Sequence, residues 1–291
     1  MRPPAELSLG SDALEVVLLP ELGARIHRLR AFGHDLLRTP ADPRTHADDP
    51  FFWGAYVMAP WCNRAPAGPT EVAGRTVDLA PNFGDGSAIH GQVSASPWTE
   101  RADGSLRVGG GGGADGWPWP YEVIARATVD ARSLNLAYDL VNRSDAPMPA
   151  GIGLHPWFRR PVEVLIPADS VYPGNAGSTP DPEPVAGALD FRVARVPEVD
   201  LDATWSALAV PRIELAWPDA RIAVSIELEA TRVLVAAASP SALDAVAVEP
   251  QTHGPDGLRR LVLAEPDAPT LLAPGEALHL GLRLTVERLP S

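Results

Sequence analysis

Two segments with the alternation of β-strands each carry one titratable side chain among small residues. In residues 151–158, GIGLHPWF, a period of two puts His155 on the same face as Gly151 and Gly153. Glycine has no side chain to pack, so such a face favours the close approach of another group. The pattern indicates room for a ligand beside the His155 imidazole. A buried histidine bonded to a backbone carbonyl would explain it about equally well.

The second segment, residues 245–252, reads AVAVEPQT and puts Glu249 on the same face as Ala245 and Ala247. A carboxylate is costly to bury unless it is paired. Partial burial would raise the pKa of Glu249 toward the range that suits a general base. A glutamate in a salt bridge at the rim of a sheet is the alternative interpretation.

Two loop segments offer hydrogen-bond donors. Residues 59–68, APWCNRAPAG, present Asn63 and Arg64 between prolines, and residues 87–91, SAIHG, present His90. Arginine holds several donors in a fixed fork, and such donors suit sugar hydroxyls and ring oxygens. Either segment taken alone is more typical of a structural role.

The other histidines lack such a setting. His27 and His279 lie in ordinary strand alternation, His46 lies in a polar loop, and His34 has no distinctive neighbours. His253 follows the Glu249 segment and is therefore a weaker candidate for the same cleft.

The elements that must position these residues are strands. The chain has 25 glycines and 32 prolines, which leave little room for helices of ordinary length. The run Gly109–Gly113 is expected to be a turn, since no lysine and helix follow it as in a phosphate loop, and Pro173–Pro184 a proline-rich connection. We predict an all-β fold, a large antiparallel β-sandwich forming one domain over residues 1–291. Its expected strands are Leu14–Leu19, Phe52–Ala59, Tyr121–Val129, Leu134–Leu140, Ala150–Phe158, Val162–Ile166, Ile222–Leu228, Ala245–Glu249 and Leu278–Val286.

Composition limits the partners. The 291 residues carry a net charge of −13 without a long run of one sign, which argues against nucleic-acid and anionic-membrane partners. The first residues lack the apolar run of a signal peptide, and no apolar stretch is long enough to span a membrane. The single cysteine, Cys62, rules out an intrachain disulfide and is expected to be a packed small residue. We therefore expect a cytoplasmic protein; nothing in the sequence indicates an oligomeric state.

Six short segments follow one another in a recognisable order along the chain. They are Pro20–Ala24, Asn63-Arg64 with Gly68, His90-Gly91, His155–Phe158, Glu249–Thr252 and Pro274–Glu276. Their order resembles that in the aldose 1-epimerases of the galactose mutarotase type. No single motif is specific, but the ordered set is, and the resemblance spans roughly Leu14 to Val286. It implies a galactose mutarotase-like β-sandwich that uses no metal and no cofactor.

The resemblance also implies roles for individual residues. His155 would be the catalytic acid and Glu249 the catalytic base, while Arg64 and His90 would bind substrate with Asn63 beside them. The segment LDATW is similar to the family's aspartate segment, which makes Asp202 the expected substrate-binding carboxylate. Gln92 after Gly91, and Trp157 in place of a frequent tyrosine, depart from the family pattern and bear on sugar specificity.

The predicted reaction is the interconversion of the α- and β-anomers of a free aldose. A sugar-binding protein without activity, or a hexose-6-phosphate 1-epimerase, would share the scaffold. His90, His155 and Glu249 could alternatively form a two-histidine, one-carboxylate metal site, although the close His-x-His pair common in such sites is absent. A glycosidase needs two flanking carboxylates, and only Glu249 has a convincing setting.

Overall fold

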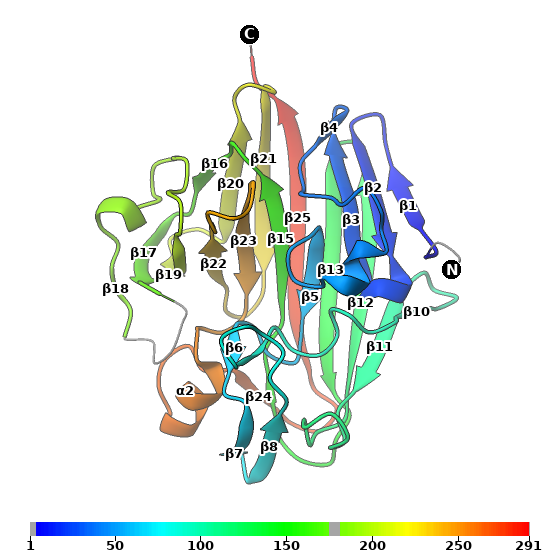
Figure 1. Cartoon of the computed structure of the whole chain (residues 1–291), viewed down its shortest axis with the longest axis vertical. Helices are drawn as coiled ribbons and strands as arrows, with labels where there is room; N and C mark the ends of the chain where they lie inside the picture. The colour runs from blue at the N-terminus through cyan, green and yellow to red at the C-terminus, as the bar shows by residue number, and fades with distance from the viewer. Residues whose placement is uncertain (1–3, 175–180, 291) are drawn as a thin grey trace.

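The computed structural model describes residues 4–174 and 181–290, and these form a sandwich of two large antiparallel sheets (Figure 1). The predicted all-β class and the sandwich are confirmed. Alternation accounts for the layers: Leu134, Leu136, Tyr138 and Leu140 are all buried in one strand, while the residues between them are half-exposed. Part of the expected connection Pro173–Pro184 falls on residues 175–180, outside the described residues.

The first sheet contains eleven strands of the described chain. Its two middle strands, β15 and β23, are covered on both faces, which is where a side chain can be held most rigidly. From edge to edge the order is β1 (Leu7–Gly10), β2 (Leu14–Leu19), β3 (Arg25–Ala31), β5 (Ala55–Met58), β15 (Gly153–Arg159), β23 (Ala245–Gln251), β22 (Leu234–Ala238), β19 (Asp202–Leu208), β17 (Ala168–Tyr172) and β18 (Glu183–Pro184), with β4 (His34–Asp35) paired to β3.

The second sheet contains eight strands of the described chain and covers the inner face of the first. Gly109 and Gly110, expected in a turn, belong to its second strand, and the turn begins at Gly111. The order is β10 (Thr99–Glu100), β11 (Leu106–Gly110), β12 (Tyr121–Asp130), β13 (Ser133–Asn142), β25 (Ala277–Arg288), β21 (Ile222–Glu229), β20 (Arg212–Trp217) and β16 (Glu163–Leu165).

Short elements fill the connections. Within residues 4–174 and 181–290, three two-stranded pairs are present: β6 (Arg64–Ala65) with β9 (Ala88–Ile89), β7 (Gly68–Val72) with β8 (Arg75–Leu79), and β14 (Met148–Ala150) with β24 (Thr270–Leu272). The helices are α1 (Thr45–Asp48) and α2 (Gly257–Leu263), with 3₁₀ turns at Pro20–Leu22 and Gly187–Leu189. No helix of the described chain is long and apolar enough to cross a membrane.

Two expected strands differ from those observed. The strand expected at Phe52–Ala59 begins only at Ala55, so the aromatic residues before it lie in a loop. The strand expected at Ala150–Phe158 is divided into β14 and β15. The division occurs because Gly151 N–H donates to the carbonyl of Pro60 and Ile152 N–H to the hydroxyl of Thr252, at 2.7 and 2.9 Å, instead of to a neighbouring strand.

The main core lies between the two sheets and includes residues from Ala13 to Val286. A smaller apolar cluster lies on the opposite face of the first sheet. Cys62 belongs to this smaller cluster; it is fully buried, and burial raises the pKa of its thiol, so it packs as a small residue. The strands that line the core therefore also present a second, partly covered face.

Candidate active site

Strand register brings His155 and Glu249 together. The antiparallel neighbours β15 and β23 pair Trp157 with Ala247, so two residues further along, His155 lies opposite Glu249. Residues opposite each other in a sheet share a face and lie within contact distance. His155 Nε2 and Glu249 Oε1 are 3.1 Å apart, and each side chain is 5% exposed.

Alanines form the floor beside this pair. In β22, Ala236 is the cross-strand partner of Glu249, and Ala238 is that of Ala247. Ala238 in turn pairs with Asp202 of β19. Methyl side chains rise little above a sheet, so the two carboxyl groups stand on either side of a depression.

Burial governs the protonation of the pair. Desolvation, followed by the charge of Asp202, raises the pKa of Glu249 from its usual value near 4.5 to about 8. Desolvation, followed by the neighbouring His90, lowers the pKa of His155 well below its ordinary range. At neutral pH these shifts favour the state in which Glu249 holds a proton and the His155 imidazole is neutral.

Two loops bring the donors to the rim. Arg64 in β6 pairs with Ile89 in β9, and His90 N–H donates to the Asn63 carbonyl at 3.0 Å. Asn63 and His90 both have left-handed backbones, with φ of 54° and 58°. Gly91 must be glycine because a Cβ there would lie 1.9 Å from the carbonyl oxygen of Ala59. Burial lowers the pKa of His90 to about 3, so this imidazole is neutral.

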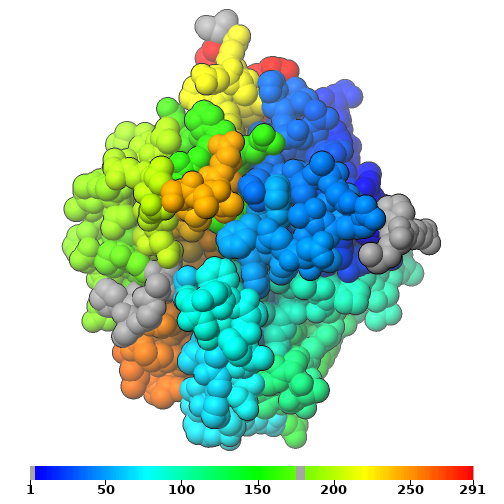
Figure 2. Space-filling model, viewed as in Figure 1, coloured from blue at the N-terminus to red at the C-terminus, as the bar shows by residue number. Residues whose placement is uncertain are grey.

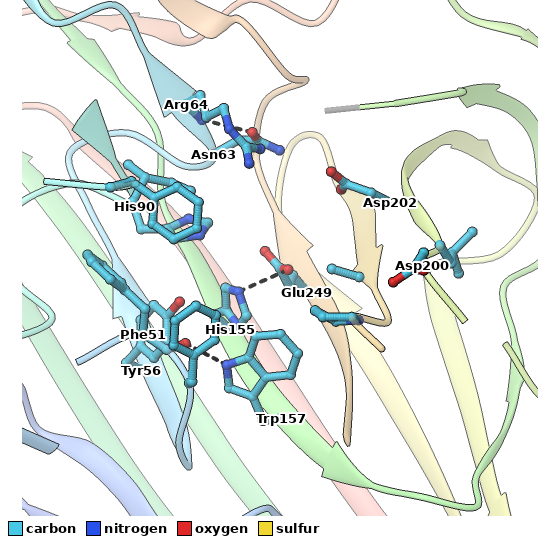
Figure 3. A pocket seen from close by; sticks show the side chains of 16 residues that line it. Phe51, Tyr56, Asn63, Arg64, His90, His155, Trp157, Asp200, Asp202 and Glu249 are labelled. Atoms are coloured by element: carbon cyan, nitrogen blue, oxygen red, sulfur yellow. Dashed lines mark hydrogen bonds and ion pairs between the residues drawn. The ribbon is translucent and has the colours of Figure 1, made fainter. Parts of the chain in front are cut away.

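All six residues proposed from the sequence line one pocket with a volume of about 260 Å³. On the face seen in Figure 2, segments from the first third of the chain (blue and cyan) border segments from its second half (yellow-green and orange). Figure 3 shows Glu249 and His155 in the middle, Asp202 on one side, and Arg64 with Asn63 at one end. The size is near the lower end for small-molecule sites, which suits a ligand of one sugar ring.

Sequence reasoning missed an aromatic wall. It consists of Phe51, Phe52, Tyr56, Phe83 and Trp157, all of which line the pocket. Tyr56 stacks on the His155 ring, with centroids 4.6 Å apart and planes 21° from parallel. The wall was missed because a strand was expected to begin at Phe52, where the structure has a loop. The three aromatic residues 51–53, directly after a proline, were the signal in the sequence that indicated this loop. Asp200, also in the pocket lining, had no such signal.

The glycines beside His155 do not make room for a ligand as expected. A Cβ on Gly151 would lie 2.1 Å from the ring of His253, and one on Gly153 would lie 2.6 Å from Met58. His253 is likewise not in the pocket lining. Its Nε2 accepts a hydrogen bond of 2.9 Å from Cys62 N–H, which ties the loop before Asn63 to the strand of Glu249.

His46 was wrongly expected in a polar loop. It lies in α1, is 1% exposed, and its Nε2 is 3.0 Å from Nδ1 of the buried His27. His279 follows the expected alternation, and its Nδ1 lies 2.8 Å from Asp139 on the outer face of the second sheet.

The geometry bears on the alternative of a metal site. His90, His155 and Glu249 each offer one ligand atom, and these atoms lie within 4.8 Å of one another. Their donor types would suit a transition metal. The same proximity, however, is what an acid–base pair with a neighbouring imidazole requires, so a chelation experiment must distinguish the two.

Comparisons with known proteins identify the family and the fold. The family model described as aldose 1-epimerase matches residues 6–250. No match was found among curated protein sequences.

Three similar solved structures support the fold. A putative aldose 1-epimerase from Escherichia coli K12 has a TM-score of 0.80 at 21% identity, covering 98% of this chain and 99% of the other. A galactose mutarotase-like protein from Clostridium acetobutylicum has a TM-score of 0.82 at 17% identity, covering 97% and 95%. A galactose 1-epimerase from Lactobacillus acidophilus NCFM has a TM-score of 0.78 at 19% identity, covering 98% and 95%.

Because the family model matches most of its length, the chain belongs to the aldose 1-epimerase family.

Proposed function

We propose that the protein is an aldose 1-epimerase that interconverts the α- and β-anomers of a free aldose by acid–base catalysis. The observation that carries the proposal is the contact of His155 Nε2 with Glu249 Oε1, at 3.1 Å, on the floor of the pocket. The hydroxyl on C1 and the ring oxygen are both attached to C1. Two groups this close can therefore serve both oxygens of one sugar.

The proposed reaction opens and recloses the ring. Glu249 removes the proton from the C1 hydroxyl, the bond from C1 to the ring oxygen breaks, and His155 gives its proton to that oxygen. The open aldehyde turns about its C1–C2 bond, and the former ring oxygen attacks the other face of C1. His155 then takes the proton back, and Glu249 returns its proton to the new C1 hydroxyl.

The pair carries one proton through this cycle. The ring-opening step starts with the proton on His155 and ends with it on Glu249, so one proton is held at every stage. Burial favours the form in which Glu249 is neutral, because it raises the pKa of the carboxyl group and lowers that of the imidazole, so the proton must pass from Glu249 to His155 before the ring opens. A purely sugar-binding protein would need neither group in this arrangement.

The charges around the pocket favour an unphosphorylated sugar. Among the described lining residues, Arg64 is the only permanent cation, and its Nε already lies 2.6 Å from Asp85. Asp200 and Asp202 face the same space. A phosphate group would bring about 1.5–2 negative charges toward these carboxylates.

The single buried cysteine is in keeping with a cytoplasmic enzyme.

The function is tested by polarimetry of freshly dissolved α-anomers against their spontaneous mutarotation. We expect at least one of glucose, galactose and xylose to equilibrate about 10²-fold faster or more with the protein. The 6-phosphates of the hexoses should show kcat/KM values at least about tenfold lower, because like charges oppose binding. Acceleration of none of these sugars would contradict the epimerase proposal, and a preference for a 6-phosphate would contradict the assignment to free aldoses alone.

Chelators should leave the activity intact. The proposed proton transfers use only side chains of the protein, so prolonged treatment with EDTA is expected to change kcat by less than about twofold. Metal analysis of the same samples provides the control. Loss of activity that one added metal restores would instead support the site of His90, His155 and Glu249 as a metal centre.

A further inference from the structure

The motif Pro20–Ala24 has no place in the acid–base mechanism, yet it introduces a buried cation directly below the site. The chain makes a 3₁₀ turn at Pro20–Leu22 and passes through Gly23, where a Cβ would lie 2.0 Å from the carbonyl oxygen of Ser94. This close approach directs the next part of the chain inward. Arg25, the first residue of β3, is 0% exposed.

The Arg25 guanidinium ties three separate carbonyl groups together. Its Nη1 donates to the carbonyl of Trp53 at 2.8 Å, and its Nη2 donates to those of Pro50 and Ser94 at 2.6 and 3.2 Å. The first two carbonyls flank the two phenylalanines at 51 and 52 that line the pocket. The loop is thus held at both ends by one side chain.

The held loop is connected to the other side of the pocket. The carbonyl of Phe51 accepts a hydrogen bond of 2.6 Å from Nε1 of Trp157, which lines the pocket from β15. Displacement of the loop would therefore move the phenylalanines and release the indole. Both belong to the aromatic wall against which a sugar ring would lie.

Arg25 also contacts the ring beneath the catalytic imidazole. Its guanidinium carbon lies 4.8 Å from the centroid of the Tyr56 ring, and Tyr56 stacks on His155. Tyr56 is fully buried, and its hydroxyl has no hydrogen-bond partner among the described residues. Packing against Arg25 and His155, and not a hydrogen bond, thus holds this ring.

We propose that Arg25 is a positioning residue of the active site, which fixes the aromatic wall through its three carbonyl bonds and supports His155 through Tyr56. The inference rests on the proposed function, because it concerns the same pocket. It goes beyond the acid–base pair in assigning part of the catalytic rate to a residue that lies outside the pocket lining. A misplacement of about 1 Å at a reacting group can cost about 10²-fold in rate.

The chain offers a matched control in Arg260. This second fully buried arginine donates from Nε to the carbonyl of Pro255 at 2.8 Å and lies 4.6 Å from the ring centroid of Tyr172. It lies in α2 and is not in the pocket lining. Its replacement removes a buried arginine and a cation–π contact without touching the aromatic wall or His155.

The experiment compares Arg25→Lys and Arg25→Met with Arg260→Lys and Arg260→Met. We expect all four to lower the thermal midpoint, but only the Arg25 variants to lower kcat, by about tenfold or more. Lysine keeps the charge but not the planar fork, so Arg25→Lys should lose kcat almost as fully as Arg25→Met. If Arg25→Met keeps kcat within about twofold, or if Arg25→Lys restores it fully, positioning through the carbonyl bonds is wrong.

A second measurement does not depend on turnover. The ring-proton resonance of His155 is sensitive to the stacked Tyr56 ring, so it should move in Arg25→Lys and stay in place in Arg260→Lys. An unmoved resonance in the folded Arg25→Lys variant would overturn the proposal whatever reaction the wild-type protein catalyses. Absence of wild-type mutarotation together with a moved resonance would contradict the proposed function alone.

Discussion

Replacing Glu249 with glutamine should lower kcat by at least about 10²-fold while changing KM little. Glutamine keeps the size and a hydrogen-bond acceptor for the C1 hydroxyl but cannot take its proton. The packing of the site should be preserved, because the cross-strand neighbour of the buried Glu249 in β22 is Ala236 and glutamine has nearly the same size. The measurement is the mutarotation rate of the accepted aldose, corrected for the spontaneous rate.

Arg64→Ala is the comparison for this variant. Arg64 stands at the rim, where it would bind the ground state and the transition state alike, so its loss should act mainly on KM. If Glu249→Gln keeps most of the wild-type kcat, Glu249 is not the base. Asp202, the other carboxylate beside the alanine floor, would then be the next candidate.

The second large effect is expected for His155→Asn, with kcat at least about 10²-fold lower and an altered pH dependence. In the wild-type protein, activity should decline as pH rises through about 8, because Glu249 then loses the one proton that the pair shares. It should also decline in acid, once His155 takes up a second proton below its usual range. Without the imidazole, the residual activity depends on ionised Glu249 alone.

The alkaline limb should therefore change sign in His155→Asn. Burial keeps the Glu249 pKa raised in the variant, so the residual rate should increase through that pKa where the wild-type rate decreases. Profiles of kcat/KM between pH 5 and about 9.5 for both proteins provide the measurement. A variant that retains the wild-type alkaline decline would show that His155 does not hold the proton in question.

Period-two alternation was sufficient to predict the fold class and most central strands. It works because one face of each strand packs in the sandwich core, as in residues 134–140. It failed at Phe52–Gly54 and at Gly151-Ile152, where apolar or small residues lie in loops whose backbone groups are bonded to distant parts of the chain. Tertiary hydrogen bonds of this kind leave no local signal in the sequence.

The site could be predicted as a set of residues but not as a geometry. Alternation correctly put Glu249 on the face of Ala245 and Ala247, and that face bears the pocket. The pairing of β15 with β23 sets the distance from Glu249 to His155, and it depends on long-range register. The expectation that the glycines beside His155 make room for a ligand was also wrong, since the group that approaches Gly151 is the His253 ring.

The double-sided burial of β23 has a consequence for folding. Val246 and Val248 enter the sandwich core, while Ala247 and Glu249 lie on the opposite face, where Ala247 packs in the smaller apolar cluster and Glu249 lines the pocket. A slip of one residue against either neighbouring strand would exchange the two sets and drive the carboxyl group into an apolar interior. The same carboxyl group that is proposed to act on the sugar thus penalises misaligned pairing, so the chain selects its correct strand alignment partly through its most reactive residue.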